Sequence, residues 1–417
     1  METDRLYSGE IPEDRTAPTD SNYLLGFAGF FVDTCPLPET VLYFGKSESK
    51  HSMETGMQGT VYNLNKADIR ASQIIKTDIP ETLAVGEILL AIEKFALTAN
   101  NITYAATGDI IGYWQFYPAP APWGIVPVWG FATVIASTSD EIKTGERLYG
   151  FFPFASHITM RPGKIKPGSF IDAAEHRAKL PPIYNDYLRL GPETPSDPRA
   201  EDIQMLFQPL FATSFLLHDF FMGENCFGAK NIILGSASSK TAMGLARLFA
   251  RYAARDRKII GLTSTGNKDF VASLGDYDET LGYDEINALP TDVPSLYIDM
   301  SGNTHVKRNL HNHLADALVY SCAVGISHWD QFEEPGDMPG AKPTFFFAPD
   351  HALRRRKDWG GQVLQQKIGT ELIDWAKAGM NWLQIEPASG MQSAAQVFAD
   401  IRDGKADPKI GHVIRVK

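Results

Sequence analysis

Cysteine is scarce in this sequence and is never paired at close range. The three cysteines of the 417 residues, Cys35, Cys226 and Cys322, lie far apart, and no CxxC pair occurs. A disulfide framework or a cysteine-built zinc site needs several cysteines at short spacing. The N-terminus is polar and acidic and lacks the apolar core of a signal peptide. These absences predict a protein of the reduced cytoplasm without such a zinc site.

An excess of positive charge and long apolar runs are also missing. The formal net charge is −11, whereas a nucleic-acid binder needs a positive surface that neutralises phosphates. No run of about 18 apolar residues occurs, so a membrane span is not expected. We therefore expect a small molecule as the partner, and neither nucleic acid nor a membrane. The sequence leaves the subunit number open, with a homodimer as one option.

The N-terminal half contains short strand patterns broken by glycine and proline. Residues 83–97, 126–138 and 147–152 are rich in β-branched and aromatic residues, and the turn Lys143-Thr-Gly-Glu precedes the third segment. This pattern predicts a small β-barrel-like lobe and not a βαβ unit. Residues 160–205 carry many prolines and charges, which predicts a long excursion or surface insertion.

Strands and helices alternate from Lys230 onward. Strands are predicted over 231–235, 257–263, 295–300 and 317–325, with helices over 241–254 and ending near 275. The preceding segment, residues 207–222, also has helical apolar spacing. Strands separated by helices imply a parallel sheet with right-handed crossovers. The predicted fold class of this half is therefore α/β, with a doubly wound sheet.

The turn after the first of these strands is the expected phosphate site. A dinucleotide normally sits there over the start of the next helix, on a glycine-rich turn. Here hydroxyl residues occupy most glycine positions, and hydroxyl groups can also donate to phosphate oxygens. A P-loop with altered spacing and a serine helix cap without any ligand remain alternatives. The candidate cofactor-binding residues are Gly235, Ser236, Ser238, Ser239, Lys240 and Thr241.

The end of the second strand indicates which dinucleotide would bind. An NAD enzyme usually carries an acidic residue there for the ribose 2′-hydroxyl. The corresponding residues 262–268 contain no acid, but do contain Thr263, Ser264 and Lys268. Hydroxyls and a cation suit a 2′-phosphate, so NADP(H) is the predicted cofactor. An ordinary polar loop with a solvated lysine is the alternative.

Five segments resemble the medium-chain dehydrogenase/reductase superfamily. Residues 83–92 resemble its early barrel strand, and Asp140-Glu-Ile-Lys-Thr-Gly-Glu-Arg-Leu-Tyr-Gly resembles its GDRVxG turn. Residues 261–268 and 274–283 resemble the SxxK…LGAD…Y run of quinone-reductase-like members. Residues 296–302 resemble the DxxG strand end beneath the cofactor, which adds Ser301 to the candidate cofactor-binding residues. The resemblance covers most of residues 80–330 and the extreme C-terminus.

The resemblance implies a Rossmann-type sheet over residues 206–339 and a GroES-like catalytic lobe over 1–205 that is completed by 340–417. The barrel strand reads Val128-Trp-Gly-Phe and lacks the His-Glu pair of zinc-dependent members, so the zinc-free branch is the implied relative. The implied activity is hydride transfer between NADP(H) and a small hydrophobic enone or ketone. A non-catalytic binding or scaffold protein and a non-redox, lyase-like enzyme on the same fold are the alternatives.

The resemblance also places the loop at residues 98–109 opposite the nicotinamide. Asn101 and Tyr104 would share one face of a helical turn, where a hydroxyl can donate to an enolate oxygen. A capping asparagine and a half-buried tyrosine are the structural alternative. His328 follows a predicted strand end and is a third candidate, as an acid. The aromatic stretch 113–123 is either a substrate wall or a loop packed on the barrel.

Overall fold

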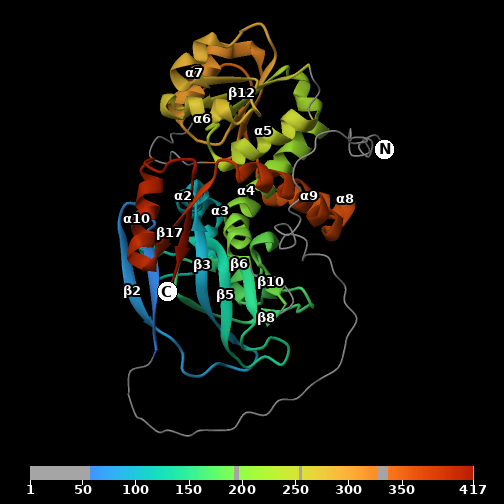
Figure 1. Cartoon of the computed structure of the whole chain (residues 1–417). Helices are drawn as coiled ribbons and strands as arrows, with labels where there is room; N and C mark the ends of the chain where they lie inside the picture. Colours follow the sequence, from blue (N-terminus) through green and yellow to red (C-terminus); the bar gives the residue numbers. More distant parts are fainter. Residues whose placement is uncertain (1–56, 192–196, 253–255, 326–336, 417) are drawn as a thin grey trace.

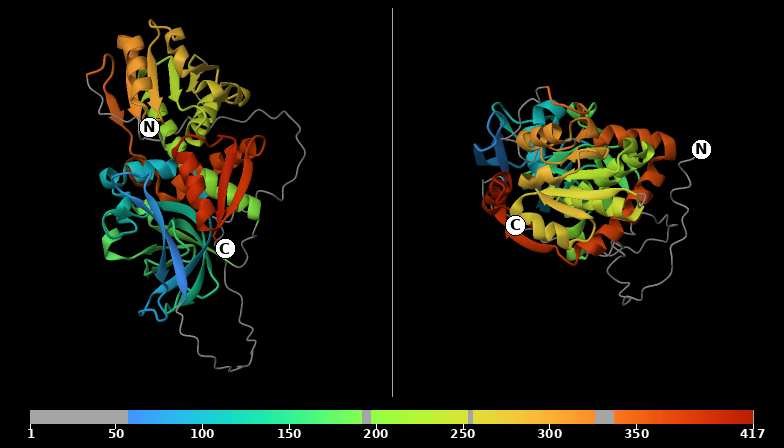
Figure 2. Two further views of the ribbon diagram at one scale, coloured as in Figure 1. Left: turned by 90° about the vertical axis from the view of Figure 1, so that its left-hand side faces the viewer. Right: turned by 90° about the horizontal axis from the view of Figure 1, so that it is seen from above.

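Two lobes, each built on its own β-sheet system, make up the described part of the chain. The computed structural model describes residues 57–191, 197–252, 256–325 and 337–416. The parallel sheet forms one end of the molecule and the strand-rich lobe forms the other, with α4 between them (Figure 1). Figure 2 shows the same division from two further sides.

The second lobe contains a six-stranded parallel sheet in the order β13-β12-β11-β14-β15-β16. This is the Rossmann strand order: β12 and β13 are added on one side of the first strand, and β14 to β16 on its other side. It confirms the predicted doubly wound fold. The strands are β11 (Asn231–Gly235), β12 (Lys258–Thr263), β13 (Glu279–Gly282), β14 (Ser295–Asp299), β15 (Leu318–Ala323) and β16 (Pro343–Phe345). The helices are α5 (Lys240–Tyr252), α6 (Lys268–Ser273) and α7 (Thr304–Leu314).

The first lobe contains a nine-stranded, largely antiparallel sheet and a three-stranded one. The C-terminal strand β18 pairs with β3, so the end of the chain completes this lobe. The larger sheet comprises β3 (Ile88–Leu97), β5 (Pro127–Ser137), β6 (Arg147–Pro153), β7 (His157–Met160), β8 (Pro162–Gly163), β9 (Ser169–Asp172), β10 (Asp186–Leu190), β17 (Gln384–Ser389) and β18 (Ile410–Arg415). The smaller one comprises β1 (Gln58–Asn65), β2 (Ser72–Asp78) and β4 (Trp123–Gly124).

The prediction of a surface insertion over residues 160–205 is wrong for residues 162–190. Strands β8, β9 and β10 extend the larger sheet, and β10 pairs directly with β6. Phe170 and Tyr187 are fully buried, and Arg177 forms a buried ion pair with Asp172 at 3.3 Å. The prolines and charges of this segment suggested exposure. Charged side chains such as Lys166 and Lys179 are exposed, but Arg177 and Asp172 neutralise each other inside the lobe.

Helix α4 (Pro198–Gly223) links the lobes and begins earlier than the predicted residue 207. Asp197 caps it by accepting from the N–H groups of Arg199 and Ala200, and Pro198 fits the first turn. None of the described helices is long and apolar enough to cross a membrane. The remaining α-helices are α2 (Ala99–Ala106), α3 (Gly108–Ile111), α8 (Ala348–Trp359), α9 (Gly361–Gly379) and α10 (Gly390–Arg402).

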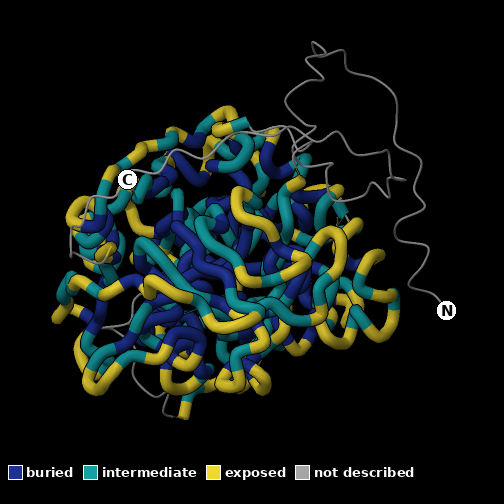
Figure 3. Tube along the Cα trace, turned by 90° about the horizontal axis from the view of Figure 1, so that it is seen from below, coloured by how far each residue is buried: buried dark blue, intermediate teal, exposed yellow. Residues whose placement is uncertain are grey.

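Buried segments gather at the centre of the molecule when it is seen from below (Figure 3). Where α4 meets β3, the ammonium of Lys94 is buried and bonds Asp202 at 2.6 Å and Glu201 at 3.1 Å. A buried charge needs such partners, since an unpaired one would cost several kcal/mol. This pairing fixes the position of the linking helix on the strand-rich lobe.

Gly130 on β5 provides a test of how closely the strands of this lobe pack. A Cβ at this position would collide with the carbonyl oxygen of Lys94 and with Phe95 on β3. We expect Gly130→Ala to lower the free energy of unfolding by about 1–3 kcal/mol, because neither backbone can move away freely. Chemical denaturation measures the change, with Gly168→Ala as the matched control, since a Cβ there meets open space. Equal stability of the two variants would contradict the packing.

Candidate active site

A large cavity lies where the two lobes meet. Its volume is about 790 Å³, within the usual range of small-molecule sites. Ser236, which follows β11, and Met300, which follows β14, both line it. These are the strand ends at which the strand order reverses, the position at which open α/β sheets bind ligands. Residues from the strand-rich lobe, including Tyr104, line the cavity as well.

The serine-rich turn enters this cavity at the start of α5. Ser236 has φ of +52°, a left-handed conformation that glycine adopts more easily, so the turn keeps a glycine-like shape without glycine. The backbone N–H groups of Lys240 and Thr241 bond no described residue. Free N–H groups at a helix start attract anions. The turn therefore has donors available for a phosphate.

Lys240 supplies positive charge at the same place. Its ammonium donates to the carbonyl oxygens of Pro408 at 3.1 Å and Ile410 at 3.0 Å, which belong to the strand-rich lobe. Burial lowers the pKa of Lys240 to about 8, and Asp407 opposes this shift. Lys240 thus both joins the two lobes and lines the cavity with a cation that titrates near neutral pH.

The end of β12 contributes Thr263 and Ser264 to the cavity, but not Lys268. The Lys268 ammonium instead bonds the carboxylate of Glu285 at 2.5 and 2.8 Å. Glu285 also accepts from the N–H of Gly282 at 2.7 Å. The charge of Lys268, which the sequence suggested for binding a 2′-phosphate, is therefore partly neutralised by Glu285.

Two other candidate cofactor residues lie behind the cavity wall. Gly235 is buried, and a Cβ there would collide with the hydroxyl of Tyr297, so close packing explains the glycine. Ser301 is fully buried and donates to Asp299 at 2.8 Å. Neither residue is among those that line the cavity. The remaining residues predicted for the turn, Ser236, Ser238, Ser239, Lys240 and Thr241, all line it.

Tyr104 on α2 faces the cavity with an unusual set of partners. Its oxygen accepts from the side-chain amide of Asn100 at 2.7 Å and from the indole N–H of Trp129 at 3.3 Å. A phenol accepts two hydrogen bonds and donates one, so the proton of Tyr104 stays available to a ligand. Burial raises the pKa of Tyr104 well above its ordinary value. The residue is thus a neutral hydrogen-bond donor at physiological pH.

Asn101 has a structural contact at each end of its amide. Its oxygen accepts from the N–H of Thr98 at 2.8 Å and its nitrogen donates to the carbonyl of Pro127 at 3.0 Å. The side chain is buried and does not line the cavity. The neighbouring Asn100, which the sequence did not single out, is the one that contacts Tyr104. His328 lies outside the described residues.

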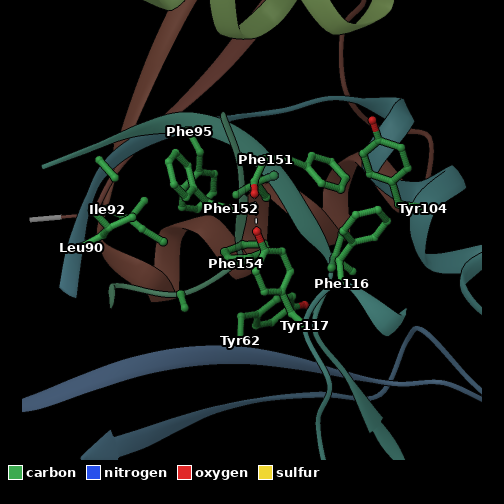
Figure 4. Packing of buried hydrophobic residues seen from close by; sticks show 14 of the residues in the cluster. Tyr62, Leu90, Ile92, Phe95, Tyr104, Phe116, Tyr117, Phe151, Phe152 and Phe154 are labelled. Carbon is green, nitrogen blue, oxygen red and sulfur yellow. Dashed lines mark hydrogen bonds between the residues drawn. The ribbon is translucent and has the colours of Figure 1, made fainter. Parts of the chain in front are cut away.

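Aromatic side chains form the wall around Tyr104, and Figure 4 shows it beside Phe116 and Phe151. Tyr113 and Tyr184 line the same cavity, and their hydroxyl oxygens lie 3.1 Å apart. Tyr149 also lines it, and its buried hydroxyl bonds no described residue. The stretch 113–123 thus contributes Tyr113 to the wall. Tyr184 was missed because it comes from the segment predicted to be an insertion.

Among the described residues, no group of three or more histidine, cysteine, aspartate or glutamate side chains is placed to hold a metal ion. On α7, His311 bonds Ser321 at 2.9 Å and His313 bonds the carbonyl of Leu289 at 2.8 Å. These imidazoles have structural partners on neighbouring elements.

Comparison with known proteins places the chain in a family. The model described as "Protein of unknown function (DUF2855)" matches residues 95–407, which is more than half of the chain. The chain belongs to the DUF2855 family. No curated protein matches this DUF2855 sequence.

Solved structures similar to this DUF2855 protein share its fold at low sequence identity. CurA from Vibrio vulnificus, in complex with NADPH, has a TM-score of 0.56 at 12% identity, over 86% of this chain and 99% of that chain. The yhdH oxidoreductase from Salmonella enterica, in complex with NADP, has a TM-score of 0.50 at 13% identity, over 87% and 100%. Mycobacterial Rv1454c, complexed with NADPH, has a TM-score of 0.51 at 13% identity, over 86% and 99%. The likeness supports a Rossmann-type sheet joined to a GroES-like lobe.

The contacts of Asn101 lead to a prediction about stability. We expect Asn101→Ala to lower the free energy of unfolding by about 1–3 kcal/mol, because it removes a helix cap and leaves the Pro127 carbonyl without a partner. Chemical denaturation provides the measurement. Asn381→Ala, at an exposed position after α9, is the control and should leave stability within about 0.5 kcal/mol of the parent. An unchanged stability of Asn101→Ala would favour the catalytic role first predicted from the sequence.

Proposed function

We propose that this DUF2855 protein is a zinc-independent oxidoreductase that transfers a hydride between NADP(H) and a small hydrophobic enone or ketone. One observation carries the proposal: the serine-rich turn at the start of α5 and the donor hydroxyl of Tyr104 line the same cavity. A phosphate-binding turn and a carbonyl-binding hydroxyl at one site are what such a reaction requires. The NADP(H) complexes of proteins with a similar fold support the choice of cofactor.

The residues of the turn fit a dinucleotide by their chemistry. The N–H groups of Lys240 and Thr241 and the hydroxyls of Ser238 and Ser239 would hold the diphosphate, and Lys240 would balance its charge. Thr263 and Ser264 would hold the 2′-phosphate of the adenosine ribose. Lys268 can contact the 2′-phosphate only when its ammonium gives up the bond to the carboxylate of Glu285. His328 stays a candidate acid from the sequence alone.

The chemistry at the other end of the cavity rests on Tyr104. When bound, NADP(H) supplies the hydride. In the reduction of an enone, negative charge would develop on the carbonyl oxygen until a proton from solvent reached the α-carbon. The Tyr104 hydroxyl would donate to that oxygen, held in place by Asn100 and Trp129. A neutral donor in a water-poor site stabilises such charge strongly.

The residues around this donor support the proposed zinc independence. In the cavity, Trp129 occupies the barrel strand at the place where the sequence lacks the His-Glu pair of zinc-dependent relatives. The donor set around Tyr104 consists of an amide, an indole and phenols, which are poor zinc ligands. Polarisation of the carbonyl therefore falls to hydrogen bonding.

Titration with NADPH tests the cofactor. We expect nicotinamide fluorescence to report saturable binding of NADPH that is tighter than that of NADH. The affinity should fall as the pH rises from 7 to 9, because Lys240 has a pKa of about 8 and loses the charge that contacts the diphosphate. Lys240→Met should bind about tenfold more weakly at pH 7 and lose this pH dependence.

Lys240→Arg is the matched control for this titration. Its guanidinium keeps the charge throughout the range, so NADPH binding should stay independent of pH between 7 and 9. Failure of the parent protein to bind either nucleotide would refute the proposed function. An identical pH dependence in all three proteins would show that another group titrates.

Removal of the Tyr104 hydroxyl tests the catalytic assignment. We expect Tyr104→Phe to lower kcat for enone reduction about 100-fold, because the developing oxyanion loses its donor. The dissociation constant of NADPH should stay within about twofold. Tyr320→Phe, which removes a hydroxyl from β15 outside the cavity, should leave both quantities unchanged. A Tyr104→Phe variant with normal kcat would remove Tyr104 from the mechanism.

A further inference from the structure

The aromatic wall has more hydroxyl protons than acceptors. The oxygen of Tyr104 is the acceptor in two hydrogen bonds, and neither bond involves the hydroxyl proton of Tyr104. Tyr113 and Tyr184 share one hydrogen bond at 3.1 Å; whichever donates, the other keeps its proton. No described residue accepts either of these two protons, and Tyr149 is a third hydroxyl without a described partner. Buried polar groups that lack partners cost stability and point to a ligand that supplies them.

The rings that carry these hydroxyls pack on one another at the cavity wall. Tyr104 and Tyr113 have centroids 4.5 Å apart, and Tyr184 meets them nearly edge-on, at interplanar angles of 80° and 73°. Phe151, which does not line the cavity, lies 4.8 Å from Tyr184. Tilted and edge-on arrangements are the ones that aromatic pairs prefer. An aromatic group of a ligand can extend this packing into the cavity.

An acidic side chain of the cavity indicates which polar group the ligand carries. Asp186, two residues after Tyr184, lines the cavity together with the cations Arg70 and Lys240. Its carboxylate can accept a hydrogen bond from a ligand hydroxyl. A phenolic hydroxyl suits a wall that offers both donors and an acceptor, because it accepts from the tyrosine pair and can donate in turn.

We propose that the Tyr113–Tyr184 hydroxyl pair binds a hydroxyl group on an aromatic ring of the substrate, so that the preferred substrates are hydroxyaryl enones or ketones. The proposal rests on the proposed function, in which Tyr104 binds the carbonyl oxygen. Tyr104 and the Tyr113–Tyr184 pair line the same cavity, so that one substrate can contact both. Tyr113 and Tyr184 are thus specificity-determining residues, and the chemistry belongs to Tyr104.

A binding experiment with two saturated ketones tests this site without turnover. The full chain, with NADP⁺ present, is titrated by calorimetry with 4-(4-hydroxyphenyl)butan-2-one and with 4-phenylbutan-2-one. We expect the hydroxyl compound to bind about fivefold more tightly, the effect of one hydrogen bond of about 1 kcal/mol. The double variant Tyr113→Phe/Tyr184→Phe should bind both ketones equally, whereas Tyr320→Phe should keep the preference.

The outcomes separate this proposal from the proposed function. Equal affinities in the parent protein, or a preference that survives in the double variant, would overturn the hydroxyaryl assignment even when NADPH binds. Absence of NADPH binding would refute the oxidoreductase, and the same two titrations without nucleotide then decide the aryl site alone. Thermal melting of the double variant shows whether it is folded, and Tyr184→Phe alone, which leaves Tyr113 in place, should show a smaller loss of preference.

Discussion

The antiparallel pairing of β18 with β3 is the contact on which the cavity depends. It joins His412–Arg415 to Lys94–Leu97 and so brings the chain back to the strand-rich lobe after the parallel sheet is complete. The segment before β18 then lies against the start of α5, where Lys240 bonds the carbonyls of Pro408 and Ile410. With this return and the linking helix α4 in place, the serine-rich turn and Tyr104 line one cavity.

In the proposed function, hydrogen bonds do the work that a metal ion or a glycine-rich turn would otherwise do at this site. Hydroxyls and a lysine line the cavity at the turn proposed to hold the diphosphate, and the indole of Trp129 lines it beside Tyr104. In that function, hydrogen-bond donors would face an anion at one end of the cavity and a carbonyl oxygen at the other. The large group of tyrosines near Tyr104 extends the same principle to recognition, because a hydroxyl with an unused proton is selective for an acceptor.

Much of the fold was predictable because it depends on local periodicity. The strands at 231–235 and 258–263 and the helix between them follow from apolar runs separated by a helical pattern, and the structure confirms them within about two residues. The segment 162–190 was not predictable in this way. Its burial depends on the Arg177–Asp172 pair and on contacts with β6, which are distant in sequence. Because of the same error, Tyr184 was not among the residues predicted for the site.

Local sequence was sufficient for the alternation that makes the parallel sheet, for the serine-rich turn after its first strand and for the absence of an acid after the second. Propensity and spacing encode these features directly. Which of the candidate side chains face one cavity was settled by long-range packing. Folding turned Asn101 toward Pro127 and paired Lys268 with Glu285, and it brought Tyr104, Tyr113 and Tyr184 together. The direction of a side chain depends on partners that folding brings from elsewhere in the chain.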